Sequence, residues 1–203
     1  MNNYLIGFCG GSGAGKTTLV SQLLNHYGNK AVAIELDSYY KDSPGLTFKE
    51  REKINFDHPD SFDIDLLKEH LILLKSGNEI KKPIYDFKTH KRQKNTNTIN
   101  PNTLIFLEGT LIFYFIELIN IINLKIFIET KESIRYQRRI DRDIKQRGRT
   151  ISNVKEQYQS TVKPMHEKYI EPLRSVAEVI ISGELDIVDS TNRVIKKIDL
   201  LTR

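Results

Sequence analysis

The residues that most clearly indicate chemistry are eight consecutive ones near the start of the chain, Gly10-Gly11-Ser12-Gly13-Ala14-Gly15-Lys16-Thr17. Two glycines five positions apart, followed by a lysine and a hydroxyl residue, form the P-loop pattern. Because glycine has no Cβ, consecutive backbone N–H groups can turn toward a single anion there. The pattern predicts a loop that binds nucleotide phosphates, with Lys16 as an added cation and the Thr17 hydroxyl as a ligand for Mg²⁺.

The segments on either side of this loop fit the pattern. The apolar run Tyr4–Phe8 predicts a buried strand, and Leu19, Val20, Leu23 and Leu24 repeat at helical spacing before Gly28. A helix that begins near Gly15 directs its free N–H groups and the positive end of its dipole at the bound anion. We therefore assign the P-loop residues and Thr18 to nucleotide binding.

Two further predicted strands lead into acidic residues. Ala31–Leu36 is followed by Asp37, and Thr103–Leu107 is followed by Glu108. In open α/β sheets, ligand-binding groups lie outside the carboxyl ends of the strands. A carboxylate such as Asp37 can accept a proton there from an acceptor hydroxyl aligned with the terminal phosphate.

The rest of the chain alternates between helical and strand patterns. The predicted elements are a helical turn at 48–53, a helix from Ile64 to Leu74, an exposed hairpin at about 82–100, an apolar helical piece from Gly109 through Ile119, a strand at 124–128, a basic helix at 132–146, a helix at 152–171 disturbed at Pro164, a strand at 179–181 and a closing helix at 192–201. This order predicts one α/β domain over 1–203, with a parallel sheet covered by helices on both faces.

Composition narrows the class of protein. A hydrophobic content of 39% suffices for a sizeable core, and the single Cys9 allows no internal disulfide. The most apolar region, 104–128, is interrupted by charged and amide side chains, and the first residues of the sequence do not show the basic-then-apolar pattern of a leader. We expect a cytoplasmic protein that does not span or bind a membrane, with Cys9 as a small core residue.

The positive charge is confined to one segment. Residues 131–149 hold eight Lys or Arg and three acidic residues, which accounts for the whole net charge of +5. A local basic element, as opposed to a broad basic face, indicates the phosphates of a small ligand and argues against nucleic acid as a partner.

Several motifs occur together in an order that resembles a known family. They are Asp37–Asp42, Asn55–Asp63, Pro83–Arg92, Glu108-Gly109, Arg138–Asp143, Arg147-Gly148-Arg149 and Gln157-Tyr158. Over about Ile6 to Ile181 the chain resembles the uridine and cytidine kinases of the phosphoribulokinase-like group. The resemblance implies a P-loop kinase fold, with the hairpin over the acceptor site and a basic helical lid at about 131–150.

The implied reaction is the ATP- or GTP-dependent phosphorylation of uridine and cytidine at the 5′-hydroxyl, which yields UMP and CMP in pyrimidine salvage. By resemblance, Asp37 is the general base, Lys16 holds the phosphates, and Arg142 and Arg147 neutralise the transferring phosphoryl group. The implied Mg²⁺ ligands are Thr17, Glu108 and Asp37. The matched substrate positions are Asp57 and Arg139 for the ribose, Tyr85, His90, Arg149 and Gln157 around the pyrimidine, and Phe56 and Phe87 as its walls.

Plainer roles compete for some residues. We expect Arg135 and Arg138 to be mostly solvated, Asp86 to hold the hairpin, and His166 to be structural on an outer helix. Thr110, the turn 129–132 and the segment 182–186 depart from the family pattern. We therefore leave the contacts of the nucleotide base, and the preference between ATP and GTP, unassigned.

Two other functions stay open. One is a related P-loop kinase that acts on phosphoribulose or pantothenate, against which the hairpin and Phe56 favour a planar base. The other is a catalytically silent, nucleotide-dependent RNA-binding or regulatory protein, against which Lys16, Asp37 and Glu108 favour chemistry. The resemblance also implies a homotetramer and inhibition by CTP.

Overall fold

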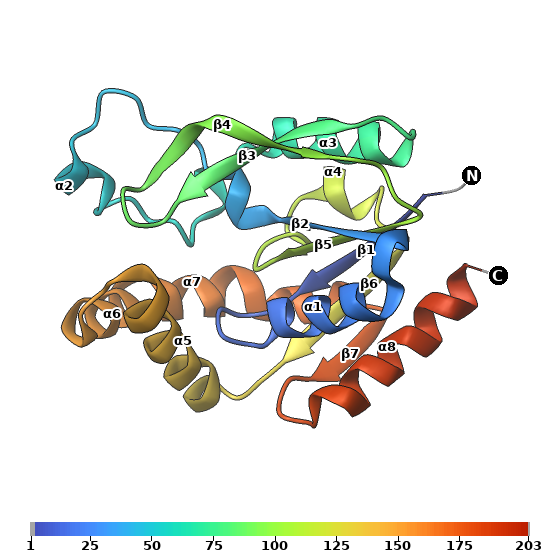
Figure 1. The fold of residues 1–203 in the computed structure, drawn as a ribbon. Coiled ribbons are helices and arrows are strands. Elements are labelled where there is room, and N and C mark those ends of the chain that lie inside the picture. The colour runs from blue at the N-terminus through green and yellow to red at the C-terminus, as the bar shows by residue number, and fades with distance from the viewer. Residues whose placement is uncertain (1–2, 203) are drawn as a thin grey trace.

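A five-stranded parallel sheet forms the centre of the protein, which the computed structural model describes over residues 3–202 (Figure 1). The strands are β1 (Tyr4–Cys9), β2 (Ala31–Glu35), β5 (Leu104–Gly109), β6 (Leu124–Glu129) and β7 (Val179–Ser182), in the order β2-β5-β1-β6-β7. All six residues of β5 are buried, as expected for a parallel strand covered on both faces. The carboxyl ends of all five strands therefore meet at one edge.

Helices cover both faces of the sheet, which confirms the predicted α/β architecture. On one face, α1 (Lys16–Tyr27) and α8 (Ile187–Leu201) pack Leu23 and Val194 against the sheet. On the other face lie α3 (Ile64–Lys75), α4 (Ile116–Ile119) and the helical segment 151–176, which bury Leu71 and Ile170. Cys9 lies in this second core as predicted, and burial raises the pKa of its thiol to about 12.

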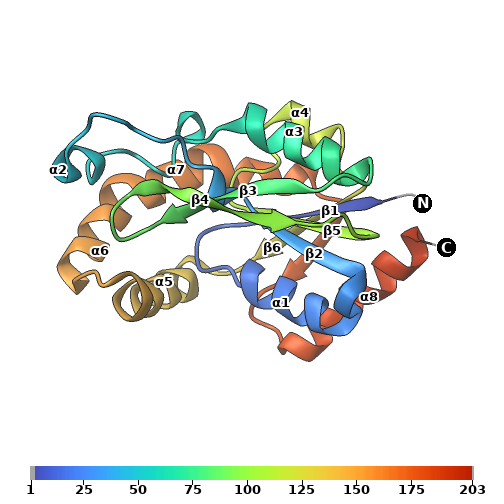
Figure 2. The same cartoon turned by 45° about the horizontal axis from the view of Figure 1, so that its top comes forward.

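The predicted hairpin forms from β3 (Ile80–Asp86) and β4 (Lys91–Ile99), and Figure 2 shows it between α3 and the β2 edge of the sheet. Asp86 holds its turn, because its carboxylate accepts hydrogen bonds from the Lys88 N–H (2.9 Å) and the Thr89 hydroxyl (2.7 Å). Arg92 ties the hairpin to the body of the protein through Asp63, at 3.0 Å, and the Tyr40 carbonyl, at 2.7 Å. Polar contacts close to its turn thus hold the hairpin against the body of the protein.

The predicted helix at 152–171 forms as part of a longer helical segment and is irregular around Pro164, as predicted. After α5 (Glu132–Arg147) come α6 (Ile151–Gln157), α7 (Lys163–Met165) and a 3₁₀ segment (Glu171–Val176), joined by wide π turns at Tyr158–Val162 and His166–Ile170. Pro164 has no backbone N–H to donate, and the wide turns on both of its sides accommodate it without ending the helix.

Two predicted helices were wrong in extent. The closing helix begins at Ile187, not at Asn192, because Asp186 caps it by accepting a hydrogen bond from the Val188 N–H (2.8 Å). The apolar segment after Gly109 is helical only over α4, while Leu111–Phe113 is a buried turn. A segment that is apolar on every side gives no periodicity from which a helix can be told from a turn.

The remaining helical pieces are short. They are α2 (Phe48–Arg51), which confirms the predicted turn at 48–53, and 3₁₀ turns at Gly28–Lys30, Leu36–Tyr39 and Pro59–Ser61. A capping box between Thr47 and Glu50 starts α2. Within residues 3–202, no helix has both the length and the apolar character that crossing a membrane requires.

Candidate active site

One cleft of about 850 Å³ opens at the carboxyl ends of β1, β2 and β5. Its walls come from the P-loop, the turn after β2, the hairpin and α5. It contains most of the predicted site residues, namely Ser12, Gly13, Gly15, Lys16, Thr17, Thr18, Asp37, Phe56, Asp57, Tyr85, Phe87, His90, Glu108, Arg139, Arg142, Arg147, Arg149 and Gln157. The fold therefore gathers residues from positions 12 to 157 of the chain into one cavity.

The P-loop carries its lysine inside the turn. Gly15 has φ +102° immediately before α1, and the Lys16 ammonium donates to the carbonyls of Gly10 (2.8 Å) and Gly11 (3.0 Å). Burial lowers the pKa of Lys16, while the nearby carboxylates of Glu108 and Asp37 oppose that shift. The ammonium is thus held among groups that keep it close to the phosphate-binding loop.

The glycines of the loop also make room for α5. Gly13 has φ +79°, and a Cβ there would lie 2.3 Å from the carbonyl oxygen of Arg135. A Cβ on Gly11 would lie 2.6 Å from the Arg135 guanidinium. The P-loop therefore packs against both the backbone and the side chain of Arg135 in the N-terminal half of α5.

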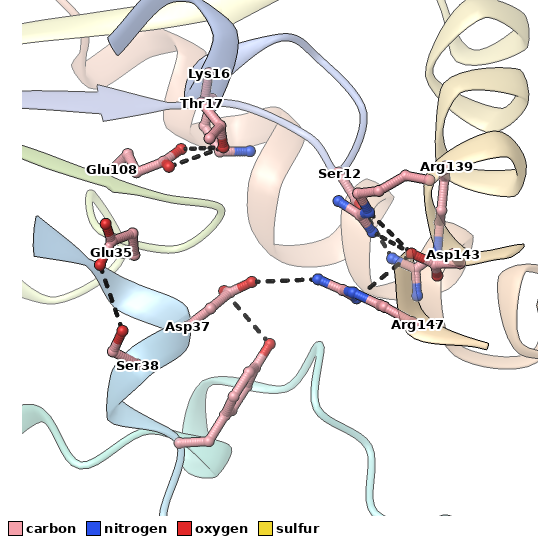
Figure 3. A network of polar contacts seen from close by, with 12 residues as sticks. Ser12, Lys16, Thr17, Glu35, Asp37, Ser38, Glu108, Arg139, Asp143 and Arg147 are labelled. Carbon is pink, nitrogen blue, oxygen red and sulfur yellow. Dashed lines mark hydrogen bonds and ion pairs between the residues drawn. The ribbon is translucent and has the colours of Figure 1, made fainter. Parts of the chain in front are cut away.

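Acidic residues line the β2–β5 edge of the cleft (Figure 3). Glu35 and Glu108 are register partners on neighbouring strands, and the Thr17 hydroxyl contacts both oxygens of Glu108 at 2.8 and 2.9 Å. Asp37 lies two residues beyond the end of β2, in the 3₁₀ turn, and not directly at the strand end as predicted. The turn directs its carboxylate toward α5.

Two side chains contact the Asp37 carboxylate. The Arg147 guanidinium lies 4.0 Å from one of its oxygens, and the Tyr40 hydroxyl lies 3.5 Å from the other (Figure 3). The last turn of α5 thus reaches across the cleft to the end of β2. Arg147 also lies over the ring of Phe87, 4.1 Å from its centroid, so the hairpin is part of the same cluster.

Aromatic rings form the hairpin side of the cleft. Phe56 and His90 stack with centroids 5.0 Å apart and an interplanar angle of 12°. Burial lowers the pKa of His90, and the positive charge of Arg149 adds to that shift. The Tyr85 hydroxyl is buried and has no hydrogen-bond partner anywhere in residues 3–202, which marks it as a group aimed at a ligand.

Polar residues complete that side. The Arg139 guanidinium donates to the Ser12 hydroxyl and to the Gln157 side-chain oxygen, both at 2.9 Å, and Arg149 also donates to Gln157. Asp57 is half-buried in the loop before Pro59; burial raises the pKa of its carboxyl, and the Arg139 charge opposes that shift. Arg139 therefore bridges the P-loop and the predicted nucleoside residues.

Comparison with known proteins is consistent with this arrangement. Residues 5–186 match the Phosphoribulokinase / Uridine kinase family. The chain belongs to this family.

Individual members of the phosphoribulokinase / uridine kinase family show how far the similarity extends. The chain is 47% identical over 182 residues to the uridine kinase of Clostridium novyi (strain NT), which covers 89% of this chain and 88% of that protein. It is 46% identical over 181 residues to the uridine kinase of Brevibacillus brevis, covering 89% and 85%. The phosphoribulokinase structure from Rhodobacter spheroides has a TM-score of 0.63 at 14% identity, covers 94% of this chain and 74% of that one, and shows the shared fold.

Sequence reasoning misplaced or missed several residues of this family member. Arg135, predicted to be solvated, is 6% exposed and donates to the Thr130 carbonyl at 3.0 Å, whereas Arg138 is exposed as predicted. His166 is buried behind the P-loop, where it pairs with Glu171 at 3.0 Å, and is not on an outer surface.

Two acidic residues of the site were missed. Glu35 lines the cleft and pairs with Lys82 of the hairpin. Asp143 is fully buried and contacts three arginines of α5. The spacing of Arg139, Asp143 and Arg147, four residues apart on a helix, was the available signal for the second.

Proposed function

We propose that this chain is a uridine kinase, which transfers the γ-phosphoryl group of ATP or GTP to the 5′-hydroxyl of uridine and cytidine. The observation that carries the proposal is a single cleft that contains a P-loop, the Asp37 carboxylate and a hairpin wall of aromatic rings. Two relatives named uridine kinase, at 46–47% identity over 89% of the chain, support the same activity.

In the proposed reaction, the Asp37 carboxylate accepts the proton of the nucleoside 5′-hydroxyl. The 5′-oxygen forms a bond to the γ-phosphorus, and the bond from that phosphorus to the β,γ-bridging oxygen breaks, leaving the electron pair on the departing nucleoside diphosphate. Lys16 and Arg142 neutralise charge on the phosphates, and Arg147, 4.0 Å from Asp37, orients that carboxylate and the transferring group.

The residues at the β2–β5 edge fit a magnesium ion. The Thr17 hydroxyl and both oxygens of Glu108 already lie within hydrogen-bond distance, and Asp37 adds a further carboxylate, so the donor set consists of oxygens, as this cation requires. We propose that Thr17, Glu108 and Asp37 hold Mg²⁺, which supplies positive charge beside the β- and γ-phosphates when bound.

The nucleoside is proposed to bind on the hairpin side. Asp57 accepts hydrogen bonds from the ribose hydroxyls together with Arg139 as donor, while Phe56 and Phe87 contact the faces of the base. Tyr85, His90, Arg149 and Gln157 surround its polar edge. The buried Tyr85 hydroxyl supports this assignment, because a polar base edge would give it a partner.

The rest of the proposal concerns the whole protein. Residues 1–203 would form a single catalytic domain that assembles as a homo-oligomer, a tetramer by family resemblance, in the cytoplasm. A kinase that acts on phosphoribulose or pantothenate is the alternative within the family. The aromatic hairpin wall favours a planar acceptor over these flexible ones.

A coupled assay of nucleoside diphosphate release, ADP from ATP or GDP from GTP, tests the proposal directly. The acceptors to compare are uridine, cytidine, thymidine, adenosine, pantothenate and ribulose 5-phosphate, each with ATP and with GTP. We expect turnover with uridine and cytidine that far exceeds turnover with the others. Preferential turnover of pantothenate or ribulose 5-phosphate would establish the alternative, and no acceptor-dependent release with any of the six would contradict an enzymatic role.

A further inference from the structure

Asp143 is the one acidic residue within reach of three lid arginines, as judged over residues 3–202. Its carboxylate lies 2.8 Å from Arg142, 3.5 Å from Arg147 and 3.5 Å from Arg139, and its side chain is 0% exposed. Arg139 and Arg147 are one helical turn before and after it, so all three side chains lie on one face of α5. Figure 3 shows this cluster facing the P-loop and Asp37.

Through these arginines, Asp143 is connected to two parts of the cleft. Arg139 and Arg142 both reach the Ser12 hydroxyl of the P-loop, at 2.9 and 3.4 Å. Arg147 reaches Asp37 at 4.0 Å. The carboxylate therefore stands at the centre of the contacts that join the phosphate loop to the proposed general base.

The charges explain why an acid is needed there. Three guanidinium groups that converge on one buried face repel one another, and burial further disfavours each charge. Burial also disfavours the ionised form of Asp143, but the fields of Arg139, Arg142 and Arg147 outweigh it and hold the pKa of that carboxyl below its usual value. Asp143 is thus ionised and offsets the repulsion.

One contact in the cluster is incomplete. The Nε of Arg139 and the Oδ2 of Asp143 face each other at 3.5 Å, yet neither atom has a hydrogen-bond partner within the described residues 3–202. A buried donor and acceptor left in this way favour any rearrangement that brings them together.

We infer that Asp143 is a positioning residue for phosphoryl transfer, which sets Arg139, Arg142 and Arg147 at the spacing that lets them act together on the P-loop, the phosphates and Asp37. The inference rests on the proposed kinase function. It does not place Asp143 in contact with the substrates. Its effect passes through the arginines.

Three substitutions on α5 test the role. Asp143→Asn removes the charge at the same size, Asp143→Glu keeps the charge but moves it by one methylene, and Asp141→Asn changes an exposed acid two residues away that contacts only Gln137 of the described chain. We expect kcat to fall by about 10²-fold in Asp143→Asn and by at least about tenfold in Asp143→Glu, the losses that misplacement by about an ångström causes. Asp141→Asn should match the wild type.

The Asp143→Glu variant distinguishes a positioning role from simple charge balance. It also keeps the inference testable if Asp143→Asn does not fold. A carboxylate that only balances charge is replaced fully by Glu, so wild-type kcat in a folded Asp143→Glu would overturn the inference. Thermal unfolding of each variant shows that the protein measured is folded.

A double-mutant cycle tests whether the effect passes through an arginine. In the Arg142→Ala background, the Asp143→Asn substitution should cost at least about threefold less in kcat than in the wild-type background, because the contact it breaks is already gone. An equal loss in both backgrounds would overturn the inference, since an independent structural effect is additive.

A measurement on the free protein tests the role of Asp143 independently of the proposed kinase function. The Arg142 Nε–H donates to Asp143 at 2.8 Å, so its NMR signal should exchange slowly with water in the wild type and in Asp141→Asn. In Asp143→Asn it should exchange faster, because a neutral amide oxygen accepts a weaker hydrogen bond than a carboxylate. Unchanged signals in Asp143→Asn would contradict the inference whatever the substrate. A wild-type protein that shows the protected signal but turns over no nucleoside would contradict the proposed function alone.

Discussion

The guanidinium of Arg147 lies 4.0 Å from the carboxylate of Asp37, although the two residues are 110 positions apart in the chain. Arg147 ends α5, and Asp37 lies in the turn that follows β2. Their contact closes the cleft between the helix that carries the lid arginines and the sheet edge that carries the acids. It also places a positive charge beside the Asp37 carboxylate at the open end of the P-loop.

Asp37→Asn should retain nucleotide binding and lose phosphoryl transfer. A positioned base contributes about 10²- to 10⁴-fold to a rate, and the loss is larger if the carboxylate also binds Mg²⁺. Steady-state kcat with uridine, together with the Kd of a fluorescent nucleotide, measures both effects. Asp42→Asn, an exposed acid in the following loop, is the matched control. Near-normal turnover in Asp37→Asn would remove this residue from the mechanism.

The Asp57 carboxylate should make the enzyme selective for ribose. The half-buried Asp57 carboxylate loses a hydrogen-bond partner when the sugar hydroxyl is missing. The kcat/KM for deoxyuridine should therefore be lower than that for uridine by a factor that corresponds to about 1 to 3 kcal/mol. Competition between the two nucleosides measures the ratio. Asp57→Asn should reduce the selectivity, and equal efficiencies in the wild type would show that Asp57 does not face the sugar.

Asp57 should also limit activity at low pH. Because burial raises the pKa of this carboxyl, it becomes protonated at a higher pH than an ordinary aspartate and then no longer accepts from the ribose. The KM for uridine should therefore rise as the pH falls toward that raised pKa.

The ionised form of Asp57 is disfavoured in the folded protein, so Asp57→Asn should raise the unfolding temperature at pH 7. A lower unfolding temperature in Asp57→Asn would show that the Asp57 charge does not destabilise the folded protein.

His90 should read the base in its neutral form down to mildly acidic pH. A neutral imidazole can donate to the uracil carbonyl in one tautomer and accept from the cytosine amino group in the other, whereas the protonated ring only donates. Burial and the positive charges of Arg149, Arg51 and Arg147 lower the pKa of His90 against the opposing charge of Glu52. The cytidine contact is therefore lost at a pH below about 6.5, the pKa of an unperturbed histidine.

The ratio of kcat/KM for cytidine to that for uridine measures the protonation of His90 directly. Inactivation of the whole enzyme at low pH affects both nucleosides equally and cancels in the ratio. We expect it to stay constant from pH 8 to about 6.5 and to fall at lower pH. In His90→Ala the ratio should not depend on pH. A fall already complete above pH 6.5 in the wild type, or no effect of His90→Ala on either nucleoside, would remove His90 from base recognition.

Tyr85→Phe should weaken nucleoside binding without loss of stability. The buried hydroxyl has no partner within residues 3–202, so its removal leaves nothing unpaired in the free protein. A neutral hydrogen bond to the base contributes about 0.5 to 1.5 kcal/mol, so the KM for uridine should rise about 2- to 10-fold. Isothermal titration and thermal unfolding check both parts. A KM equal to that of the wild type would show that this hydroxyl does not meet the base.

Gly13→Ala should destabilise the protein more than Gly28→Ala. Both glycines have positive φ, but a Cβ at Gly13 meets the Arg135 carbonyl at 2.3 Å, whereas one at Gly28 meets nothing within 4 Å in the described structure. A positive-φ backbone alone costs a non-glycine residue about 1 to 3 kcal/mol, which for a domain of this size lowers the unfolding temperature by roughly 2–12 °C. Gly28→Ala should show that loss, and Gly13→Ala a clearly larger one. Equal losses would contradict the packing of the P-loop on α5.

Local patterns in the sequence determined the nucleotide half of the protein. The glycine spacing before Lys16, the buried strand before it and the helix after it act over a few residues, so β1, the P-loop and α1 follow from local physics. The acids after β2 and β5 could likewise be predicted to share an edge, because parallel strands end together. The hairpin and the basic helix also follow from alternation and helical spacing.

Only the tertiary structure decided what the charged residues of α5 do. Arg135, Arg138 and Asp143 are alike in sequence as members of a charged helix, but packing buries Arg135 against Gly11, leaves Arg138 exposed and surrounds Asp143 with guanidinium groups. The irregular turn at Leu111–Phe113 likewise depended on contacts made by the folded chain, whereas the Asp186 cap that starts α8 is a local signal that sequence reasoning missed. Burial and pairing are properties of which surfaces meet, and a surface that faces solvent in an isolated helix can face a P-loop once the sheet has brought the two together.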